Sequence, residues 1–392
     1  MSRLNVGNLY NENEDGAPVV SGISTFSSPN YFVPPSGTTA QRPQNPGEGM
    51  IRFNIDSGHL EYYSGELWVD VIVNNNDLGG GLNGIGTTAS TQGTGTRALI
   101  IGGQQSAGND LARIEYITIS TLGDAQTFGD TSVTRGQGAS CASKTRGYLM
   151  GGLISPNTYS NVIDSHEFSS TGDFIDYGDL TVNRRLNAGL SNSTRGISLG
   201  GQGGSPVAVQ DVIDYFALQT TGTAQDFGNL RGGTDTFGSA LASPIRGIYS
   251  DGSANNKTLD FITISTTGDS QSFGDLSTNR GTYVNTAANS TRGIFAGGAT
   301  NPGTPANTNT IDFITIATTG NASDFGDLTR TTAECNGGTA SPTRAIFAGG
   351  GPSASDTIDC IEILSTGNAV DFGNLQTASS HNSACSNGHG GL

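Results

Sequence analysis

One short motif in this sequence could mark a catalytic nucleophile. GISLG, Gly196 to Gly200, fits the GxSxG pattern with Ser198 at its centre. That pattern is catalytic when the serine sits on a sharp turn between a strand and a following helix. No helical periodicity follows Gly200, and other copies of the same stretch read GYLMG and GIFAG. We therefore expect Ser198 to be an ordinary strand residue and the protein not to be an enzyme.

Metal and cofactor chemistry has equally little support. None of the four histidines belongs to an HExxH or paired-histidine pattern, and the four cysteines show no CxxC spacing. The glycine-rich GQGGS, Gly201 to Ser205, lacks the Lys-Ser/Thr ending of a phosphate-binding loop. No stretch has the acidic ladder of a calcium-binding loop. We expect no metal and no cofactor, and we expect Cys141, Cys335, Cys360 and Cys385 to be free, buried thiols.

The charge balance excludes two classes of partner. The 392 residues carry a formal net charge of −16, and Lys144 and Lys257 are the two lysines. No basic stripe exists that could neutralise nucleic-acid phosphates, and no run approaches the roughly 20 apolar residues of a membrane helix. We expect no nucleic-acid binding, no membrane insertion and, because no signal-peptide pattern opens the chain, synthesis in a cytoplasm.

Arginine recurs in a fixed context about every 50 residues, as in TRGYLMGG and TRGIFAGG. The six copies are Arg97, Arg146, Arg195, Arg246, Arg292 and Arg344. Such a residue could contact a receptor, but once per repeat it is more economically a structural group that bonds a neighbouring unit's backbone or carboxylate. Two sets of recurring acids could be its partners: Glu115, Asp164, Asp214, Asp260, Asp312 and Asp359, or Asp130, Asp179, Asp275 and Asp327.

The elements that position these residues follow from the rest of the unit. After each glycine pair come a variable polar stretch, a β-branched strand such as IDFITI, a turn of TTG type and a short aromatic motif such as DFGDL. The turn glycine recurs at Gly123, Gly172, Gly222, Gly268, Gly320 and Gly367. The aromatic residues, which we expect to form core layers between units, are Phe128, Tyr177, Phe227, Phe273, Phe325 and Phe372.

About four short strands per unit is the composition of a propeller blade. The strand ending in Gly-Gly, the second strand, the turn and the late aromatic resemble the Kelch repeat from Arg97 to Leu375, although Phe or Tyr replaces the repeat tryptophan and Asp251-Gly252 replaces one glycine pair. The resemblance implies an all-β fold with a six-bladed Kelch-like β-propeller over residues 96–392. For closure, we expect Ser379 to Gly388 to pair beside Arg97 to Ile101; the rival strand is Gly84 to Gly93.

The N-terminal part, residues 1–73, does not follow the repeat. MIRFNI, HLEYYS and ELWVDV predict a small β-hairpin or meander region, which is too small to be stable alone. Its apolar residues, including Phe53, Tyr62 and Trp68, therefore predict burial against a neighbour or another copy, and so a homo-oligomer. Residues 74–95 are rich in Gly, Asn and Thr, which is typical of a flexible linker.

The segment from Ser36 to Val71 resembles N-terminal regions of tailed-bacteriophage fibre and appendage proteins, and IDFITIATTGNASDFGDLT is similar to strings in structural proteins of phages, particularly those of marine cyanobacteria. The resemblance implies a non-enzymatic virion protein assembled in the host cytoplasm, whose N-terminal region docks on other virion proteins. The propeller would recognise a host-surface glycan or protein. The alternatives are a capsid or neck decoration protein and a cellular Kelch-type scaffold.

Variable loops on a repeated scaffold are where recognition evolves. The stretches that follow the glycine pairs are therefore the expected recognition loops. Their candidate contact residues are Gln104, Asn109, Asn157, Tyr159, Gln202, Gln210, Asn301, Asn307 and Ser353.

Overall fold

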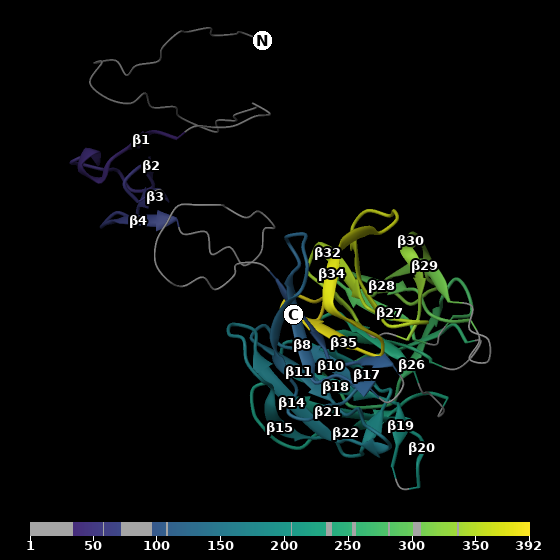
Figure 1. Ribbon diagram of the computed structural model, residues 1–392. Coiled ribbons are helices and arrows are strands. Elements are labelled where there is room, and N and C mark those ends of the chain that lie inside the picture. Colours follow the sequence, from purple (N-terminus) through teal and green to yellow (C-terminus); the bar gives the residue numbers. More distant parts are fainter. Residues whose placement is uncertain are drawn as a thin grey trace. The chain divides into compact units, whose positions relative to one another are not determined.

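The structure is a computed structural model that describes residues 34–57, 59–71, 96–106, 109–204, 206–232, 237–252, 256–280, 283–300, 307–334 and 337–392. Within these ranges the chain is all-β, with one short 3-10 turn at Thr39–Gln41, so the predicted fold class is confirmed at this level. The chain divides into two compact units, Met1–Asn75 and Asn76–Leu392, drawn in Figure 1. The predicted linker and the rival closing strand Gly84 to Gly93 lie outside the described residues.

The N-terminal unit is a four-stranded sheet. β1 (Ser36–Gly37) pairs in parallel with β2 (Ile51–Asn54), and β2, β3 (His59–Tyr63) and β4 (Trp68–Val71) form an antiparallel meander. The three strands expected from the sequence are confirmed. Their tight connections follow the Ser-Gly dipeptides, and Gly65 has a φ of 97°, a left-handed conformation that glycine adopts without a steric penalty.

The second unit contains, among its described residues, six four-stranded antiparallel sheets, which we number I to VI along the chain. Sheet I consists of β35 (Ser383–Ser386), β5 (Arg97–Ile101), β8 (Arg113–Thr118) and β9 (Gln126–Asp130). Sheet II consists of β10 (Ala139–Ala142), β11 (Arg146–Met150), β14 (Val162–Glu167) and β15 (Ile175–Asp179). Sheet III consists of β17 (Ala188–Ser191), β18 (Arg195–Leu199), β21 (Val212–Ala217) and β22 (Gln225–Asn229).

The other three sheets have the same strand order. Sheet IV consists of β23 (Ser239–Ala242), β24 (Arg246–Ser250), β25 (Thr258–Thr263) and β26 (Gln271–Asp275). Sheet V consists of β27 (Asn285–Ala288), β28 (Arg292–Ala296), β29 (Thr308–Thr315) and β30 (Ser323–Thr332). Sheet VI consists of β31 (Gly338–Ala340), β32 (Arg344–Ala348), β33 (Ser355–Glu362) and β34 (Val370–Ser379).

Short strands decorate the connections between the second and third strands. β6 (Gln104–Ser106) pairs with β7 (Asn109–Asp110), and β12 (Leu153–Ile154) pairs with β13 (Thr158–Tyr159). β16 (Arg184–Arg185), which belongs to the segment that crosses from sheet II to sheet III, joins β19 (Gln202–Gly203) and β20 (Ala208–Val209) in a three-stranded ribbon. The variable loops are therefore built onto the sheets by backbone hydrogen bonds.

The first strand of sheet I comes from the C-terminus. β35 pairs antiparallel with β5, with Ser383 opposite Ile101 and Ser386 opposite Ala98, which confirms the expected pairing of the C-terminal segment. Figure 1 shows this C-terminal strand, in yellow, beside the blue strands from the start of the unit. The first strands of consecutive sheets are also neighbours, from β10 through β17, β23, β27 and β31 to β35, and β35 again contacts β10.

Removing Ser383 to Leu392 should therefore destabilise the second unit, because it exposes the paired edge of β5 and the buried side chains Leu99 and Ile101. We expect the melting temperature to fall by about 10 °C or more, with aggregation on heating. Circular dichroism melts with light scattering measure both effects. A truncated chain that melts cooperatively at the parental temperature would contradict this role of β35.

Candidate functional site

The repeated arginines lie at the junctions between sheets. Arg195 donates from Nη1 to the backbone oxygen of Ile264, 2.9 Å away, which directly follows the third strand of the next sheet. The same bond joins Arg97 to Phe168, Arg246 to Ile316, Arg292 to Ile363 and Arg344 to Ile119. Four of these guanidinium groups also lie over an aromatic ring of their own sheet, 4.5–4.8 Å from its centroid. Of the other two arginines, Arg344 has Cys360 in place of the ring, and Arg146 donates instead to Ser165 Oγ and Glu167 Oε1 of its own sheet.

The six recurring aromatic residues are buried between consecutive sheets. Phe325 of sheet V, for example, packs with Ile361 and Ile363 of sheet VI. Tyr177, Phe227 and Phe273 lie in the equivalent clusters of the II–III, III–IV and IV–V junctions, and Phe128 lies in that of the I–II junction. Phe372 of sheet VI packs with Ile117 and Ile119 of sheet I. Each ring therefore belongs to a core layer shared by two sheets.

The glycine after each aromatic residue has a steric role. A Cβ at Gly129 would overlap the carbonyl oxygen of Gly172, the turn glycine of the next sheet. The close approach allows the Gly172 N–H to donate to the Phe128 oxygen over 2.8 Å. The equivalent bond recurs at all junctions, including that from Gly123 to Phe372. The fourth strand of each sheet is thereby hydrogen-bonded by the turn of the next one.

The recurring acids have partners other than those expected. Asp214 accepts from Arg184 Nη2 at 2.5 Å and from Thr181 Oγ1 at 2.7 Å, and not from a repeated arginine. Arg184 and Thr181 belong to the segment that crosses from sheet II to sheet III. Arg135–Asp164 and Arg280–Asp312 repeat this pair at 3.0 and 2.9 Å. Ser132 and Ser277 donate to the same two aspartates, as Thr181 does to Asp214, so these bonds anchor the crossing segments.

These three arginines are fully buried and anchor the crossing segments. Because a charged residue is ordinarily exposed, the sequence did not predict them. Arg135, Arg184 and Arg280 are among the largest fully buried side chains, and burial lowers the pKa of each guanidinium. The visible signal was a Ser/Thr three residues before the arginine, at Ser132, Thr181 and Ser277. Of the second set of acids, Asp275 forms an ion pair with Lys257, at 3.5 Å, and not with a repeated arginine.

The Arg184→Ala variant should lose about 3–5 kcal/mol of unfolding free energy, because it leaves the Asp214 carboxylate buried without its cation. Arg231→Ala is the matched control. Arg231 pairs with Asp260 at the equivalent junction, but its side chain is 51% exposed, so the expected loss is below about 1 kcal/mol. Urea unfolding measures both variants. Equal losses would contradict the assignment of stability to burial of the pair.

The crossing segments carry a ring of unusual backbone geometry. One residue shortly before the first strand of each sheet adopts a left-handed conformation with φ between 51° and 67°, although none of the six is glycine. They are Gln137, Leu186, Phe237, Tyr283, Glu334 and His381. Backbone bonds link neighbours, such as Leu186 N to Gln137 O at 2.7 Å and His381 N to Glu334 O at 2.5 Å. We call these six residues the left-handed ring.

We call the end of the sheets that bears this ring the crossing face. It also carries the loops between second and third strands, because those loops and the crossing segments meet at the same strand ends. Conformations that are costly for residues with a Cβ concentrate at functional sites. The crossing face is therefore the candidate functional site.

One half of the crossing face is a polar network. Arg185 donates from Nη1 to Gln137 Oε1 at 3.1 Å and from Nη2 to Gln202 Oε1 at 2.9 Å, and its guanidinium lies 5.1 Å from the Tyr159 ring centroid. Gln137 in turn donates to Gln104 Oε1 at 3.4 Å. Amide, guanidinium and phenol groups thus converge from sheets I, II and III.

The other half is aromatic. The Phe237 and Tyr283 rings lie 4.4 Å apart between centroids, and Tyr283 meets His381 edge to face at 5.3 Å, with His381 Nε2 3.3 Å from the Tyr283 hydroxyl. Burial lowers the pKa of His381 to about 4, so its imidazole is neutral at pH 7. Burial also raises the pKa of the Glu334 carboxyl. The surface combines flat apolar rings with hydrogen-bonding groups.

The predicted contact residues divide into three groups. Tyr159 and Gln202 join the polar network, whereas Asn109, Asn157 and Ser353 are exposed and Asn307 is half-buried on outer loops. Gln210 closes its own loop by donating to Gly203 O. Gln104 is buried, its amide is held by Asp110 at 2.6 Å and its Oε1 accepts from Gln137, so it supports the polar network from within. Asn301 lies outside the described residues.

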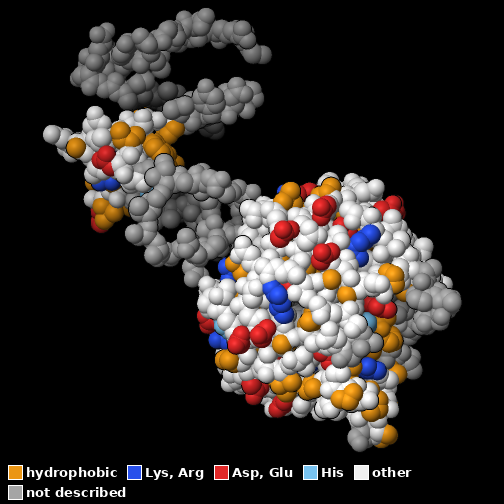
Figure 2. Space-filling view, viewed as in Figure 1, with side chains coloured by type: hydrophobic (Ala, Val, Ile, Leu, Met, Phe, Trp, Pro, Cys, Tyr) orange, Lys and Arg blue, Asp and Glu red, His pale blue; other side chains and the backbone are white. Residues whose placement is uncertain are grey.

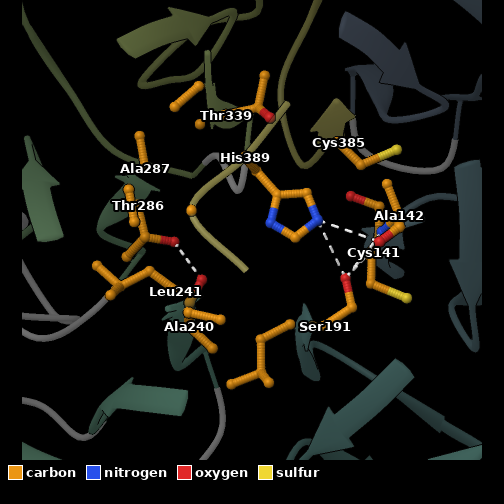
Figure 3. A pocket seen from close by; sticks show the side chains of 18 of the residues that line it. Cys141, Ala142, Ser191, Ala240, Leu241, Thr286, Ala287, Thr339, Cys385 and His389 are labelled. Carbon is orange, nitrogen blue, oxygen red and sulfur yellow. Dashed lines mark hydrogen bonds between the residues drawn. The ribbon is translucent and has the colours of Figure 1, made fainter. Parts of the chain in front are cut away.

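The space between the first strands is closed by the C-terminus. Figure 3 shows His389 pointing into this space, toward Ala142 and Ser191. His389 Nε2 lies 3.1 Å from Ala142 O, and its Nδ1 accepts from Gly391 N at 3.1 Å, so Nε2 carries the proton. The remaining cavity of ≈ 50 Å³ holds a water molecule or two and no larger ligand.

Ser198 and the cysteines, whose residue types could do chemistry, lie in ordinary structural positions. Ser198 is fully buried in β18 and accepts from Asn187 Nδ2 at 2.8 Å, as an ordinary strand residue. Cys141, Cys360 and Cys385 are free and buried, and Cys335 lies outside the described residues. In the described ranges no cluster of His, Cys, Asp or Glu could hold a metal, and no helix there could cross a membrane.

Replacing Glu334 by Gln should stabilise the protein at neutral pH. The raised pKa means that the folded state binds the proton more tightly than the unfolded state, so the ionised carboxylate opposes folding once the pH exceeds that pKa. We expect the melting temperature of Glu334→Gln to exceed the parental value by roughly 2 °C at pH 7 and to match it at pH 4. A difference that grows toward low pH would contradict the prediction.

No protein-family model and no curated protein sequence matches this chain. Its function is therefore argued from the geometry described above and from the resemblances of its repeat and N-terminal segment.

Proposed function

We propose that this protein is a non-enzymatic component of a tailed-phage particle, of the tail-fibre or appendage type. In this proposal residues 96–392 form a closed six-bladed Kelch-like propeller whose crossing face recognises the host surface. The N-terminal unit attaches the protein to other virion proteins and to further copies of itself.

Closure of the propeller is supported by relations that return from sheet VI to sheet I. β35 completes sheet I, and Arg344 reaches Ile119 and Ser120. Phe372 packs with Ile117, and Gly123 bonds its backbone. The arginine bond recurs at four other junctions, and the aromatic cluster and the glycine bond recur at all of them, so the last junction is built like the rest.

Recognition is supported by one observation above all. The left-handed ring places six different residue types at equivalent positions, while the junctions around it repeat almost unchanged. A purely structural role would favour glycine at all six positions, because only glycine adopts this conformation without cost. The combination of Phe237 and Tyr283 with Arg185 and Gln202 suits a saccharide, which has apolar C–H faces and a rim of hydroxyls.

The charge distribution fits a neutral or weakly charged target. On the face of the molecule in Figure 2, Lys and Arg side chains stand singly among Asp and Glu, with most of the surface uncharged. A polar surface that is nowhere strongly basic avoids the non-specific attraction that a basic surface has for anionic polymers.

Self-association is supported by an inverted pattern in the N-terminal sheet. The face that carries Arg52, Asn54 and Glu61 is buried, with Arg52 Nε 3.4 Å from Glu61 Oε1. The opposite face exposes Ile51, Phe53 and Tyr62, of which Ile51 is 54% exposed. An apolar face of this kind on so small a sheet requires a cover, which a second copy supplies.

Particle localisation tests the virion proposal. Mass spectrometry of purified particles should detect the chain in stoichiometric amounts, and cryo-electron microscopy should place it at the periphery of the tail or appendages. A position on the capsid shell or neck would instead identify a decoration protein. Absence from particles would overturn the proposal in favour of a cellular scaffold.

Binding of the protein to host cells tests the proposed role of the crossing face. The full chain with Tyr159→Ala and Arg185→Ala should lose at least ten-fold in cell-bound protein, measured by flow cytometry. Ile245→Ser is the control, because Ile245 is 67% exposed at the opposite strand ends. Equal binding by parent and double variant, with folding shown to be intact by circular dichroism, would exclude the crossing face.

A further inference from the structure

The junction between sheets II and III breaks the repeat. In sheets I, III, IV and V, an aromatic ring in the third strand lies under the repeated arginine, as Tyr215 does under Arg195. Sheet II has Ser165 at this register position, opposite Tyr148. The side chain at this position is therefore much smaller than the ring of the four other sheets, and it is fully buried.

The arginine of this junction also points elsewhere. Tyr148 Oη donates to Leu218 O at 2.5 Å, and Tyr177 Oη donates to Ala217 O at 2.9 Å. The Tyr148 hydroxyl thus occupies the Leu218 carbonyl, which is equivalent to the carbonyls that the arginines reach at the other junctions. Arg146 instead donates to Ser165 Oγ and Glu167 Oε1, each 3.2 Å away. Sheet VI also lacks the ring, having Cys360 there, but Arg344 still crosses to Ile119 and fills its junction.

A pocket of ≈ 590 Å³ opens at the place where the repeat is broken. It lies at the strand ends opposite the crossing face, since the turns between first and second strands and between third and fourth strands line it. This volume is in the range of pockets that bind small molecules. The site is thus separate from the crossing face.

The lining is cationic on one side. Lys144 is exposed and makes no ion pair in the described part of the chain, and the Arg146 side chain is partly exposed while it holds Glu167. Asp176 is the one acidic side chain among the lining residues and lies at the exposed rim. Lys144 and Arg146, two positions apart in the chain, both belong to the lining. They are suited to a carboxylate.

The rest of the lining is suited to a sugar ring. Thr221 and Gln219 offer hydroxyl and amide groups and Ile175, 62% exposed, offers apolar surface, while Ser165 and Leu218 are buried members of the lining. We propose that this pocket binds a carboxylate-bearing pyranose, such as a hexuronic acid, with Lys144 and Arg146 facing the carboxylate. The inference rests on this junction alone and does not depend on the proposed virion function.

Isothermal titration calorimetry of the full chain tests the proposal with three probes: D-galacturonic acid, its linear trimer and neutral D-galactose. We expect both acids to bind and galactose to bind at least ten-fold more weakly. Tighter binding of the trimer than of the monomer would identify the natural ligand as a polysaccharide segment. Equal affinities for trimer and monomer would identify it as a free sugar acid. Binding of galactose as tight as that of galacturonic acid, or no binding of either acid, would overturn the proposal.

Two variants place the ligand in the pocket. Lys144→Ala should weaken galacturonic acid at least five-fold, and Ser165→Tyr, which restores the ring found in sheets I and III, should abolish binding by filling the space. Lys257→Ala is the matched control and should bind like the parent, because Lys257 pairs with Asp275 in sheet IV. If Lys144→Ala bound galacturonic acid with the parental affinity, the binding site would lie elsewhere and the proposal would be wrong. This outcome does not depend on whether Ser165→Tyr folds.

Discussion

The contact between one sheet and the next is the constraint on which the rest of this structure depends. A four-stranded sheet of these dimensions has two faces and two edges, and it cannot bury its apolar side chains by itself. Each sheet here is completed by its neighbour, through a shared aromatic cluster, a turn that bonds the fourth strand and, at every junction but II–III, an arginine bonded to a backbone oxygen. Repetition of the unit follows from this dependence, because every junction poses the same packing problem.

Residues can diverge toward a function at places where other groups already secure the packing between sheets. The crossing segments are held from beneath by buried ion pairs such as Arg184–Asp214, so the residues above them are free to differ from sheet to sheet. The left-handed ring uses this freedom at six equivalent positions. The II–III junction uses it differently: tyrosine hydroxyls replace the arginine bond, and a pocket takes the place of a ring.

Much of the repeat could be read from the sequence, because its spacing is rigid. Phe325 and its counterparts were predictable as core layers, and the pairing of Ser383 to Ser386 with β5 followed from the position of an unused strand. The buried arginines were missed because a charged residue is ordinarily exposed, and only the fold shows that Asp214 faces the crossing segment. The left-handed ring had no consistent signal, since His381 alone among its six residues is of a type enriched in this conformation. In the N-terminal sheet, alternation identified the strands but not which face was buried.

The proposed closed propeller requires that the six sheets depend on one another in a ring. Native-state hydrogen exchange, followed by mass spectrometry on peptides that cover the second strands, tests it directly. In a closed ring no sheet is terminal, so Arg97–Ile101 and Arg344–Ala348 should exchange as slowly as Arg195–Leu199, in the middle of the array. An open array frays from its ends, because terminal units have only one neighbour. Protection that falls steadily from sheet III toward sheets I and VI would contradict the account.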